Sequence, residues 1–217
     1  MNKYLNQFLG FRCAGDVINA VTPVNKMAKE LTEAMAVWYR LRKFTLKEPG
    51  RYSVIDACAG NGLVGILSVF TLPVKQCIAF DKRLRTRPPW TKGAIERWEY
   101  RVADIHNDFH VADIICDLGK DIILAASHPC AGLAERCVEL FNRLTEIKGL
   151  VFLPCCIRGG SVKGFPRLLS ESSLSKYELW GLRLLEKCQT DDKDLYHDKN
   201  VLSPANCVLW ARKEGSE

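Results

Sequence analysis

The stretch SVIDACAGNGL, residues Ser53–Leu63, decides the fold class. An apolar run that contains Asp56 leads into a turn with Gly60 and Gly62, and an apolar, helix-like segment follows. Strand, glycine turn and helix in this order are typical of open α/β sheets, whose ligands bind at the carboxyl ends of the strands. Glycine lets the backbone approach a ligand because it has no Cβ. A short Gly-x-Gly also closes ordinary turns, so the stretch predicts a ligand-binding turn with that alternative open.

Strand-like and helix-like segments alternate after this stretch. The continuous apolar run Ile122–Ala126 is what a sheet covered on both faces requires. We therefore expect an α/β fold: a Rossmann-like, doubly wound, mostly parallel sheet with an N-terminal helical cap. Expected strands are Tyr52–Cys58, Gln76–Phe80, Glu99–Ala103, Asp121–Ala126, Leu150–Leu153 and Cys207–Arg212. Expected helices are Leu63–Phe70, Thr91–Trp98, Leu133–Thr145 and Ser175–Cys188.

The first part of the chain has a helical pattern instead. Apolar residues recur every three or four positions from Met27 to Leu41, which predicts one amphipathic helix, with Pro23 at its start and Thr22 as its N-cap. Shorter helices are expected at Tyr4–Leu9 and Gly15–Val21. We divide the chain into an N-terminal helical segment, residues 1–47, packed on a core domain, residues 48–217. The polar run Thr190–Asn200 predicts an exposed loop.

Composition narrows the class of protein. The chain has 217 residues, of which 47% are hydrophobic, enough for one full core. Its apolar runs are shorter than the ~20 residues that span a bilayer, and its start lacks the layout of a signal peptide, so we expect a cytoplasmic protein without membrane contact. Several of its ten cysteines, such as Cys58 and Cys77, lie in apolar strand-like segments, and no C-x-x-C pair is present, so we expect a reducing compartment and no metal site. The oligomeric state is left open.

Two acids follow the next strands at the positions where nucleoside-binding sheets use them. Asp81 comes 21 residues after Gly60, where a carboxylate accepts hydrogen bonds from ribose hydroxyls. Asp104 follows the third strand, where it can accept from the amine of adenine while the Ile105 side chain packs on the ring. Each acid alone is also a common cap or turn residue. A nicotinamide-binding domain is the competing interpretation, but Cys58 stands where its first glycine is expected.

Four segments together resemble the class I S-adenosylmethionine-dependent methyltransferases. They are the turn Asp56–Gly62, the segment Ala126–Leu133 (ASHPCAGL), the segment Leu153–Cys156 (LPCC) and the ending Val201–Lys213. The last three are similar to one branch, with His-x-Cys and Cys-Cys elements, that includes tRNA ribose 2'-O-methyltransferases and related methyltransferase-like proteins. The resemblance spans residues 53–213. Ala131 and Ile157 differ from that branch, and its zinc-finger segments are absent, so the tRNA substrate is not carried over.

The resemblance implies S-adenosylmethionine as the cofactor. An acid near the methionine end, which Asp56 matches, is also implied. Together with the strand-end positions, it gives one expected set of cofactor contacts: Asp56, Cys58, Gly60, Gly62, Asp81, Lys82, Asp104, Ile105 and Ser127. Methyl transfer from a sulfonium requires alignment of donor and acceptor and no metal. His128, at the end of the fourth strand, is the expected base, and Cys130 joins it as a candidate catalytic residue. A capping or core role for His128 remains open, as does simple packing for Cys130.

The acceptor is expected to be RNA. Basic and aromatic residues after the second and fifth strands offer cations for phosphates and rings for stacking. Expected substrate contacts are Arg83, Arg85, Arg87, Trp90, Cys155, Cys156, Arg158 and Lys163. A solvated basic face explains part of the same pattern. Three alternatives stay open: a cofactor-binding or RNA-binding module with weak catalysis, a methyltransferase acting on protein or a small molecule, and a nicotinamide oxidoreductase.

Overall fold

The computed structural model of this chain describes residues 2–21, 25–83, 96–155 and 173–213. Strands and helices alternate within these ranges, which confirms the α/β class. The strands are β1 Ser53–Ala57, β2 Cys77–Asp81, β3 Trp98–Val102, β4 Ile122–Ser127, β5 Ile147–Leu153, β6 Lys193–His197 and β7 Cys207–Arg212. The helices are α1 Lys3–Leu9, α2 Ala14–Ala20, α3 Met27–Thr45, α4 Leu63–Thr71, α5 Asp108–Leu118, α6 Gly132–Arg143 and α8 Lys176–Lys187.

The strands form one sheet in the order β3-β2-β1-β4-β5-β7-β6. The first five of these neighbours are parallel, and β7 runs antiparallel to both β5 and β6. The expected mostly parallel, Rossmann-like sheet is therefore confirmed. The order reverses between β1 and β4, and ligands of open α/β sheets bind in the crevice at such a reversal. The fold thus points to the carboxyl ends of β1 and β4 as the place to look for a site.

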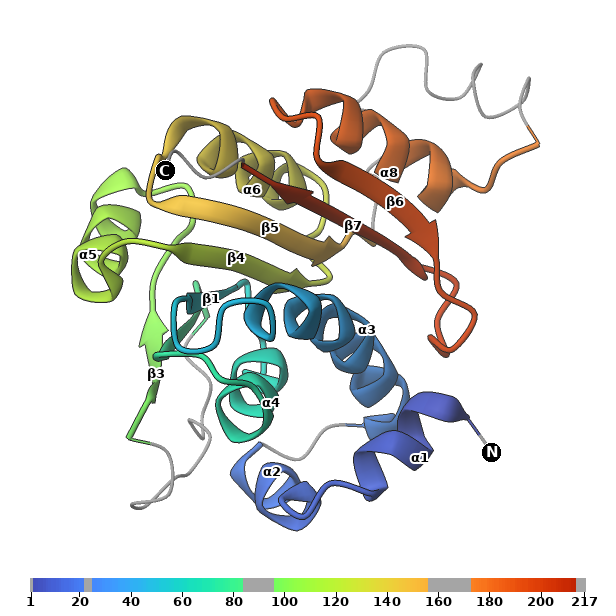
Figure 1. The fold of residues 1–217 in the computed structure, drawn as a ribbon. Coiled ribbons are helices and arrows are strands. Elements are labelled where there is room, and N and C mark those ends of the chain that lie inside the picture. Colours follow the sequence, from blue (N-terminus) through green and yellow to red (C-terminus); the bar gives the residue numbers. More distant parts are fainter. Residues whose placement is uncertain (1, 22–24, 84–95, 156–172, 214–217) are drawn as a thin grey trace.

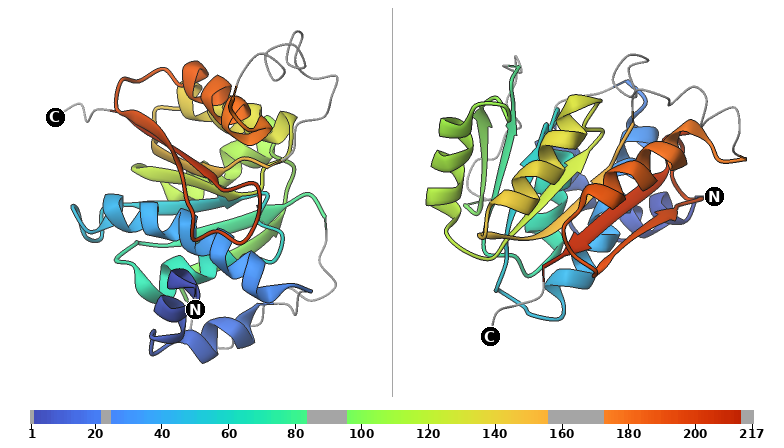
Figure 2. Two further views of the ribbon diagram at one scale, coloured as in Figure 1. Left: turned by 90° about the vertical axis from the view of Figure 1, so that its right-hand side faces the viewer. Right: turned by 90° about the horizontal axis from the view of Figure 1, so that it is seen from above.

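Helices cover both faces of the sheet (Figure 1). Successive side chains of a strand point to opposite faces, so each central strand supplies two cores. Val54 and Ile123 belong to the core shared with α1 to α4, whereas Ile55 and Leu124 belong to the core shared with α5, α6 and α8. The right-hand view of Figure 2 looks onto the face that α6 and α8 cover. This two-sided burial explains why the central strands are apolar throughout.

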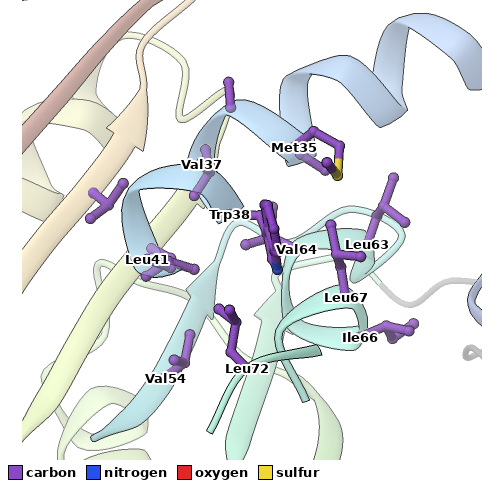
Figure 3. Packing of buried hydrophobic residues seen from close by; sticks show 14 of the residues in the cluster. Met35, Val37, Trp38, Leu41, Val54, Leu63, Val64, Ile66, Leu67 and Leu72 are labelled. Atoms are coloured by element: carbon purple, nitrogen blue, oxygen red, sulfur yellow. The ribbon is translucent and has the colours of Figure 1, made fainter. Parts of the chain in front are cut away.

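Helix α3 lies on the sheet itself. Its residues Met35, Trp38 and Leu41 are almost fully buried and face α4 and β1 (Figure 3). The Trp38 Nε1 donates a hydrogen bond to Thr71 Oγ1 at 2.6 Å. Burial of one such large apolar side chain contributes about 1.5–3 kcal/mol. Residues 1–47 and 48–217 therefore share one hydrophobic core, and α3 is one of its covering helices.

Three local expectations differ from the structure. Helix α3 begins at Met27, after Lys26 with φ 69°, and not at Pro23; Thr22 and Pro23 lie outside the described residues. The helix expected over Thr91–Trp98 does not reach Trp98, because that residue already begins β3; residues 91–95 lie outside the described ranges.

The third difference is at the far edge of the sheet. The run Thr190–Asn200, expected as a loop, contains the edge strand β6, which pairs antiparallel with β7. An edge strand leaves side chains in solvent, so its sequence is polar and resembles that of a loop.

Candidate active site

The turn after β1 is built from left-handed backbone. Cys58 has φ 54°, Gly60 has φ 57° and Gly62 has φ 74°. Glycine adopts this conformation without cost, whereas a cysteine in it is strained, so the surrounding structure must hold the turn in place. Two hydrogen bonds do so: Ala59 N–H donates to the Phe80 carbonyl at 2.9 Å, and Gly62 N–H donates to the Ala59 carbonyl at 2.8 Å. The turn is therefore a fixed piece of backbone at the carboxyl end of β1.

The Asp56 side chain connects the end of β1 to the start of α4, on either side of this turn. Its carboxyl is 1% exposed, and Oδ2 accepts a hydrogen bond at 2.9 Å from the N–H of Gly65 in the first turn of α4. Burial raises the pKa of Asp56 to about 7. Asp56 is not part of the cavity wall described below. The structure thus places Asp56 under the turn, and its expected contact with the methionine end of the cofactor stays a prediction.

Asp81 ends β2 beside the turn and is 7% exposed. Its Oδ2 accepts a hydrogen bond from the Gly60 N–H at 3.1 Å. Its Oδ1 accepts one from the Arg83 N–H at 3.0 Å and lies 3.4 Å from Arg83 Nε. Tyr100 on β3 donates its hydroxyl proton to the Gly60 carbonyl at 2.9 Å. The structure therefore brings Gly60 and Asp81 together, as the sequence predicted.

Asp104 follows β3 and forms a pair with Lys82. The Lys82 ammonium is 2.7 Å from Asp104 Oδ2, and the His106 N–H donates to Oδ1 at 3.0 Å. The lysine, and then this backbone bond, lower the pKa of Asp104, so the carboxylate is charged. Ile105 is 2% exposed and packs in the core under α5 and α6; its expected contact with the adenine ring stays a prediction.

A cavity of about 450 Å³ opens at the carboxyl ends of β1 and β4. Its walls come from four parts of the chain that are distant in sequence: the first turns of α3, the turn after β1 with the start of α4, Arg83 after β2, and the end of β4. The cavity lies at the strand-order reversal, as the fold leads one to expect. Its lining residues are Lys29, Glu30, Ala34, Cys58, Ala59, Gly60, Asn61, Leu63, Val64, Arg83, Ser127, His128 and Cys130.

A buried carboxylate stands behind His128. Glu33 of α3 is 0% exposed, and its Oε1 is 2.6 Å from His128 Nε2. The Lys29 ammonium is 2.8 Å from the same oxygen. Burial by itself would raise the pKa of Glu33, but the contacts with His128, Lys29 and Ser203 outweigh burial and hold this pKa below its ordinary value. Glu33 is therefore a charged group in the interior, paired with one imidazole and one ammonium.

The thiols lie close to this histidine. The Sγ atoms of Cys130 and Cys155 are 2.8 Å apart, and the His128 carbonyl accepts from the Cys130 thiol at 3.4 Å. Cys58 lines the same cavity, and burial raises the pKa of its thiol well above the usual value, which keeps that thiol protonated. Cys58 and Cys130 form part of the wall, where small polarizable side chains pack well. Cys155, an expected substrate contact, is buried beside Cys130 and does not line the cavity.

The structure brings together a large share of the expected site residues. Cys58, Gly60, Arg83, Ser127, His128 and Cys130 line one cavity, and Asp81 contacts its wall. Gly62 caps α4 at the end of the same turn. The remaining expected substrate contacts, Arg85, Arg87, Trp90, Cys156, Arg158 and Lys163, lie outside the described residues.

The sequence reasoning missed the contribution of α3 to the site. Lys29 and Glu30 line the cavity and Glu33 lies behind it, yet all three belong to a helix that was assigned only to a cap. One signal was available: Glu33 is the only charged residue in the run Leu31–Trp38, and a buried charge is expensive unless it is paired. The sequence does not name the partner, because His128 is distant along the chain.

The described residues include neither a membrane-spanning helix nor a group of side chains that could bind a metal. No helix among them is long and apolar enough to cross a membrane. No three of their His, Cys, Asp or Glu side chains are grouped so that they can hold a metal ion.

Comparisons with known proteins find solved structures that align with much of this chain at low sequence identity. No family model matches the chain, and neither does any curated protein. Among solved structures, M. capricolum TrmK in complex with S-adenosylhomocysteine is 11% identical with a TM-score of 0.41, and the alignment covers 79% of this chain and 66% of that one, just under two thirds.

Two further structures are similar in the same way. The antibiotic-resistance methyltransferase Kmr is 18% identical with a TM-score of 0.46, over 81% of this chain and 92% of that one. The small RNA methyltransferase HEN1 is 13% identical with a TM-score of 0.47, over 90% of this chain and 27% of that one. Because these TM-scores lie below 0.5, the fold assignment rests on the strand order and the function on the site residues.

Proposed function

We propose that this chain is a methyltransferase that binds S-adenosylmethionine in the cavity at the carboxyl ends of β1 and β4 and methylates RNA. One observation carries the proposal: the glycine turn, the Asp81 carboxylate and His128 meet around a single cavity at the strand-order reversal. A nucleoside-binding turn and a candidate base are thus within reach of one bound molecule.

The residues present suit this cofactor. Ligand cavities are typically about 300–1,000 Å³, and this one is about 450 Å³. The Asp81 carboxylate accepts from Gly60 and Arg83 at the rim of the cavity, and a carboxylate has further lone pairs that can accept from ribose hydroxyls. Asp104 supplies a second charged acceptor at the end of the neighbouring strand. Gly60 and Asn61 line the cavity, and a ligand can approach the backbone at Gly60 because glycine carries no Cβ.

The chemistry divides between cofactor and chain. When bound, S-adenosylmethionine supplies a methyl group on a sulfonium, which is already a strong electrophile. The chain has to align the acceptor and remove its proton. His128 lies in the cavity wall with one ring nitrogen against Glu33, so its other nitrogen can accept that proton. Ser127 and Cys130, on either side of His128, shape the wall where an acceptor would enter.

The sheet order favours this proposal over a nicotinamide oxidoreductase. Dinucleotide-binding sheets combine two parallel halves in the order 3-2-1-4-5-6, whereas here β7 is antiparallel and inserted between β5 and β6. Cys58 also occupies the first position of the glycine series with a left-handed backbone.

Charge supports RNA as the acceptor. The chain carries a formal net charge of +6, and cationic side chains of Lys29 and Arg83 line the cavity. The Arg83 side chain is 73% exposed, so it can reach a phosphate outside the cavity. Glu30 is the acidic exception in the lining.

Calorimetric titration with S-adenosylmethionine, S-adenosylhomocysteine and NAD tests the cofactor, and a filter assay with methyl-labelled donor and total RNA tests the acceptor. We expect both adenosyl compounds to bind, NAD not to bind, and label to enter RNA. His128→Ala and Asp104→Ala should abolish labelling. Asp194 and His197 are exposed on β6, so the matched control substitutions His197→Ala and Asp194→Ala should leave the labelling of RNA unchanged. Label found only in protein or small molecules rejects RNA, and binding of NAD alone rejects the methyltransferase.

A further inference from the structure

We propose that Glu33 is a positioning residue that fixes the tautomer of His128, so that Nδ1 is the ring nitrogen that accepts the acceptor's proton. This inference rests on the proposed function for the proton transfer, but not for the tautomer. No role for Glu33 follows from the sequence patterns, and the contact joins α3 to the end of β4, two elements that are distant along the chain.

The first step is the location of the proton. Glu33 Oε1 and His128 Nε2 are 2.6 Å apart, an ion-pair contact whose angles lie outside the hydrogen-bond range. Lone pairs on both atoms would repel each other at that distance, so Nε2 is the nitrogen that carries a proton. Glu33 is held in its charged form by three partners, and an ionised carboxylate can only accept. The proton therefore belongs to Nε2 of the imidazole.

The second step follows from imidazole chemistry. A neutral imidazole carries one N–H and one lone pair, so a proton on Nε2 leaves the lone pair on Nδ1. His128 can then take up a proton only at Nδ1. The buried Glu33 carboxylate lies against Nε2 and so fixes which side of the ring is open to that proton. No covalent bond to the chain forms in this step.

The Glu33 carboxylate is itself held in place by Lys29. The Lys29 ammonium is 2.8 Å from Oε1, and a hydrogen bond of 2.9 Å joins it to Oε2. Lys29 and Glu33 lie one helical turn apart on α3, which makes them natural neighbours. His128 has φ 60°, so a strained backbone also sets the direction of its side chain. Lysine, carboxylate and imidazole thus form a chain of fixed contacts that ends at the cavity.

Long-range ¹H–¹⁵N NMR of histidine-labelled protein tests this, since it reports which ring nitrogen is protonated in the protein without cofactor or substrate. Only four histidines are present, and His128→Gln identifies the His128 signals. At pH 8.5 we expect the wild type to carry a proton on Nε2 and none on Nδ1. In Glu33→Gln the amide can donate as well as accept, so a second tautomer with Nδ1–H should appear. Glu30→Gln removes a charge from the same turn of α3 and should leave the tautomer unchanged.

Activity provides the second measurement. If Glu33 positions His128, Glu33→Gln should lower kcat by about 100-fold while the Kd for S-adenosylhomocysteine stays within about twofold, which also reports an intact fold. A wild-type spectrum with a proton on Nδ1, or identical tautomers in wild type and Glu33→Gln, overturns the inference. An Nε2–H tautomer that depends on Glu33, in a protein that methylates nothing, keeps the positioning role and overturns the proposed function instead.

Discussion

A single residue, Asp81, connects the glycine turn to the edge of the cavity. Its carboxylate accepts from Gly60, and a charged acceptor typically contributes about 1.5–3 kcal/mol per hydrogen bond. We therefore expect Asp81→Asn to weaken S-adenosylhomocysteine binding about tenfold or more in calorimetry. The matched control is Asp194→Asn on the exposed edge strand β6, which should bind as the wild type does. Equal affinities for wild type and Asp81→Asn would contradict this role.

Asp56 makes stability depend on pH. Its pKa is about 7 in the folded protein because of burial, above the 3.8 that applies without burial. Between these values the folded state binds the proton and the unfolded state does not, so the contribution of Asp56 to stability is complete below about pH 4 and is lost as the pH rises through 7. Urea unfolding should show a loss of up to roughly 4 kcal/mol that is missing in Asp56→Asn. The same pH dependence in both proteins would show that Asp56 does not titrate in this way.

The residues of the site were predictable where the chain order carries the signal. Gly60, Asp81 and His128 each follow a strand, and parallel strands end at one edge, so their meeting follows from the alternation of strands and helices. Glu33 was not predictable in the same way. Its partner lies on another element, and the approach of α3 to the end of β4 depends on the packing of the whole core.

The close packing of helix α4 on the sheet depends on Gly65. A Cβ at this position would lie 2.8 Å from Cys77 Sγ and 2.9 Å from Trp98 Nε1. Gly65→Ala should therefore lower the free energy of unfolding by about 1–3 kcal/mol, measured by urea denaturation. Gly132→Ala is the matched control near the start of α6, because nothing lies within 4 Å of its added Cβ. A Gly65→Ala protein as stable as Gly132→Ala would contradict the close approach.

Elements with strong apolar patterns were predicted well, and those at the surface were not. The strand at Cys207–Arg212 has the expected bounds, since it is buried in the sheet. The edge strand β6 was expected as a loop, because its polar side chains fit either state and its pairing with β7 is a tertiary contact. Helix α5 was not predicted at all, although Asn107 caps it with hydrogen bonds to two backbone N–H groups.

Across the whole molecule, the N-terminal helices and the sheet share a hydrophobic core. Residues of α1 to α4 share one core with β1, β4, β5 and β7, and Glu33 of α3 reaches into the site. We expect a fragment of residues 48–217 to lose fixed tertiary structure, because the face under α3 would be exposed. Near-UV circular dichroism and binding of a hydrophobic dye would show this against the full chain. A fragment with native-like near-UV signal and cooperative unfolding would show that the division at residue 47 separates independent units.

A crystal structure of the protein with S-adenosylhomocysteine is the decisive measurement for cofactor binding at this turn. We expect the adenosyl group to lie along the turn at Gly60 with a ribose hydroxyl on Asp81, and the sulfur to point to the side of the cavity where His128 lies. A ligand bound elsewhere, or Asp81 and Asp104 turned away from a cavity filled by side chains, would contradict it.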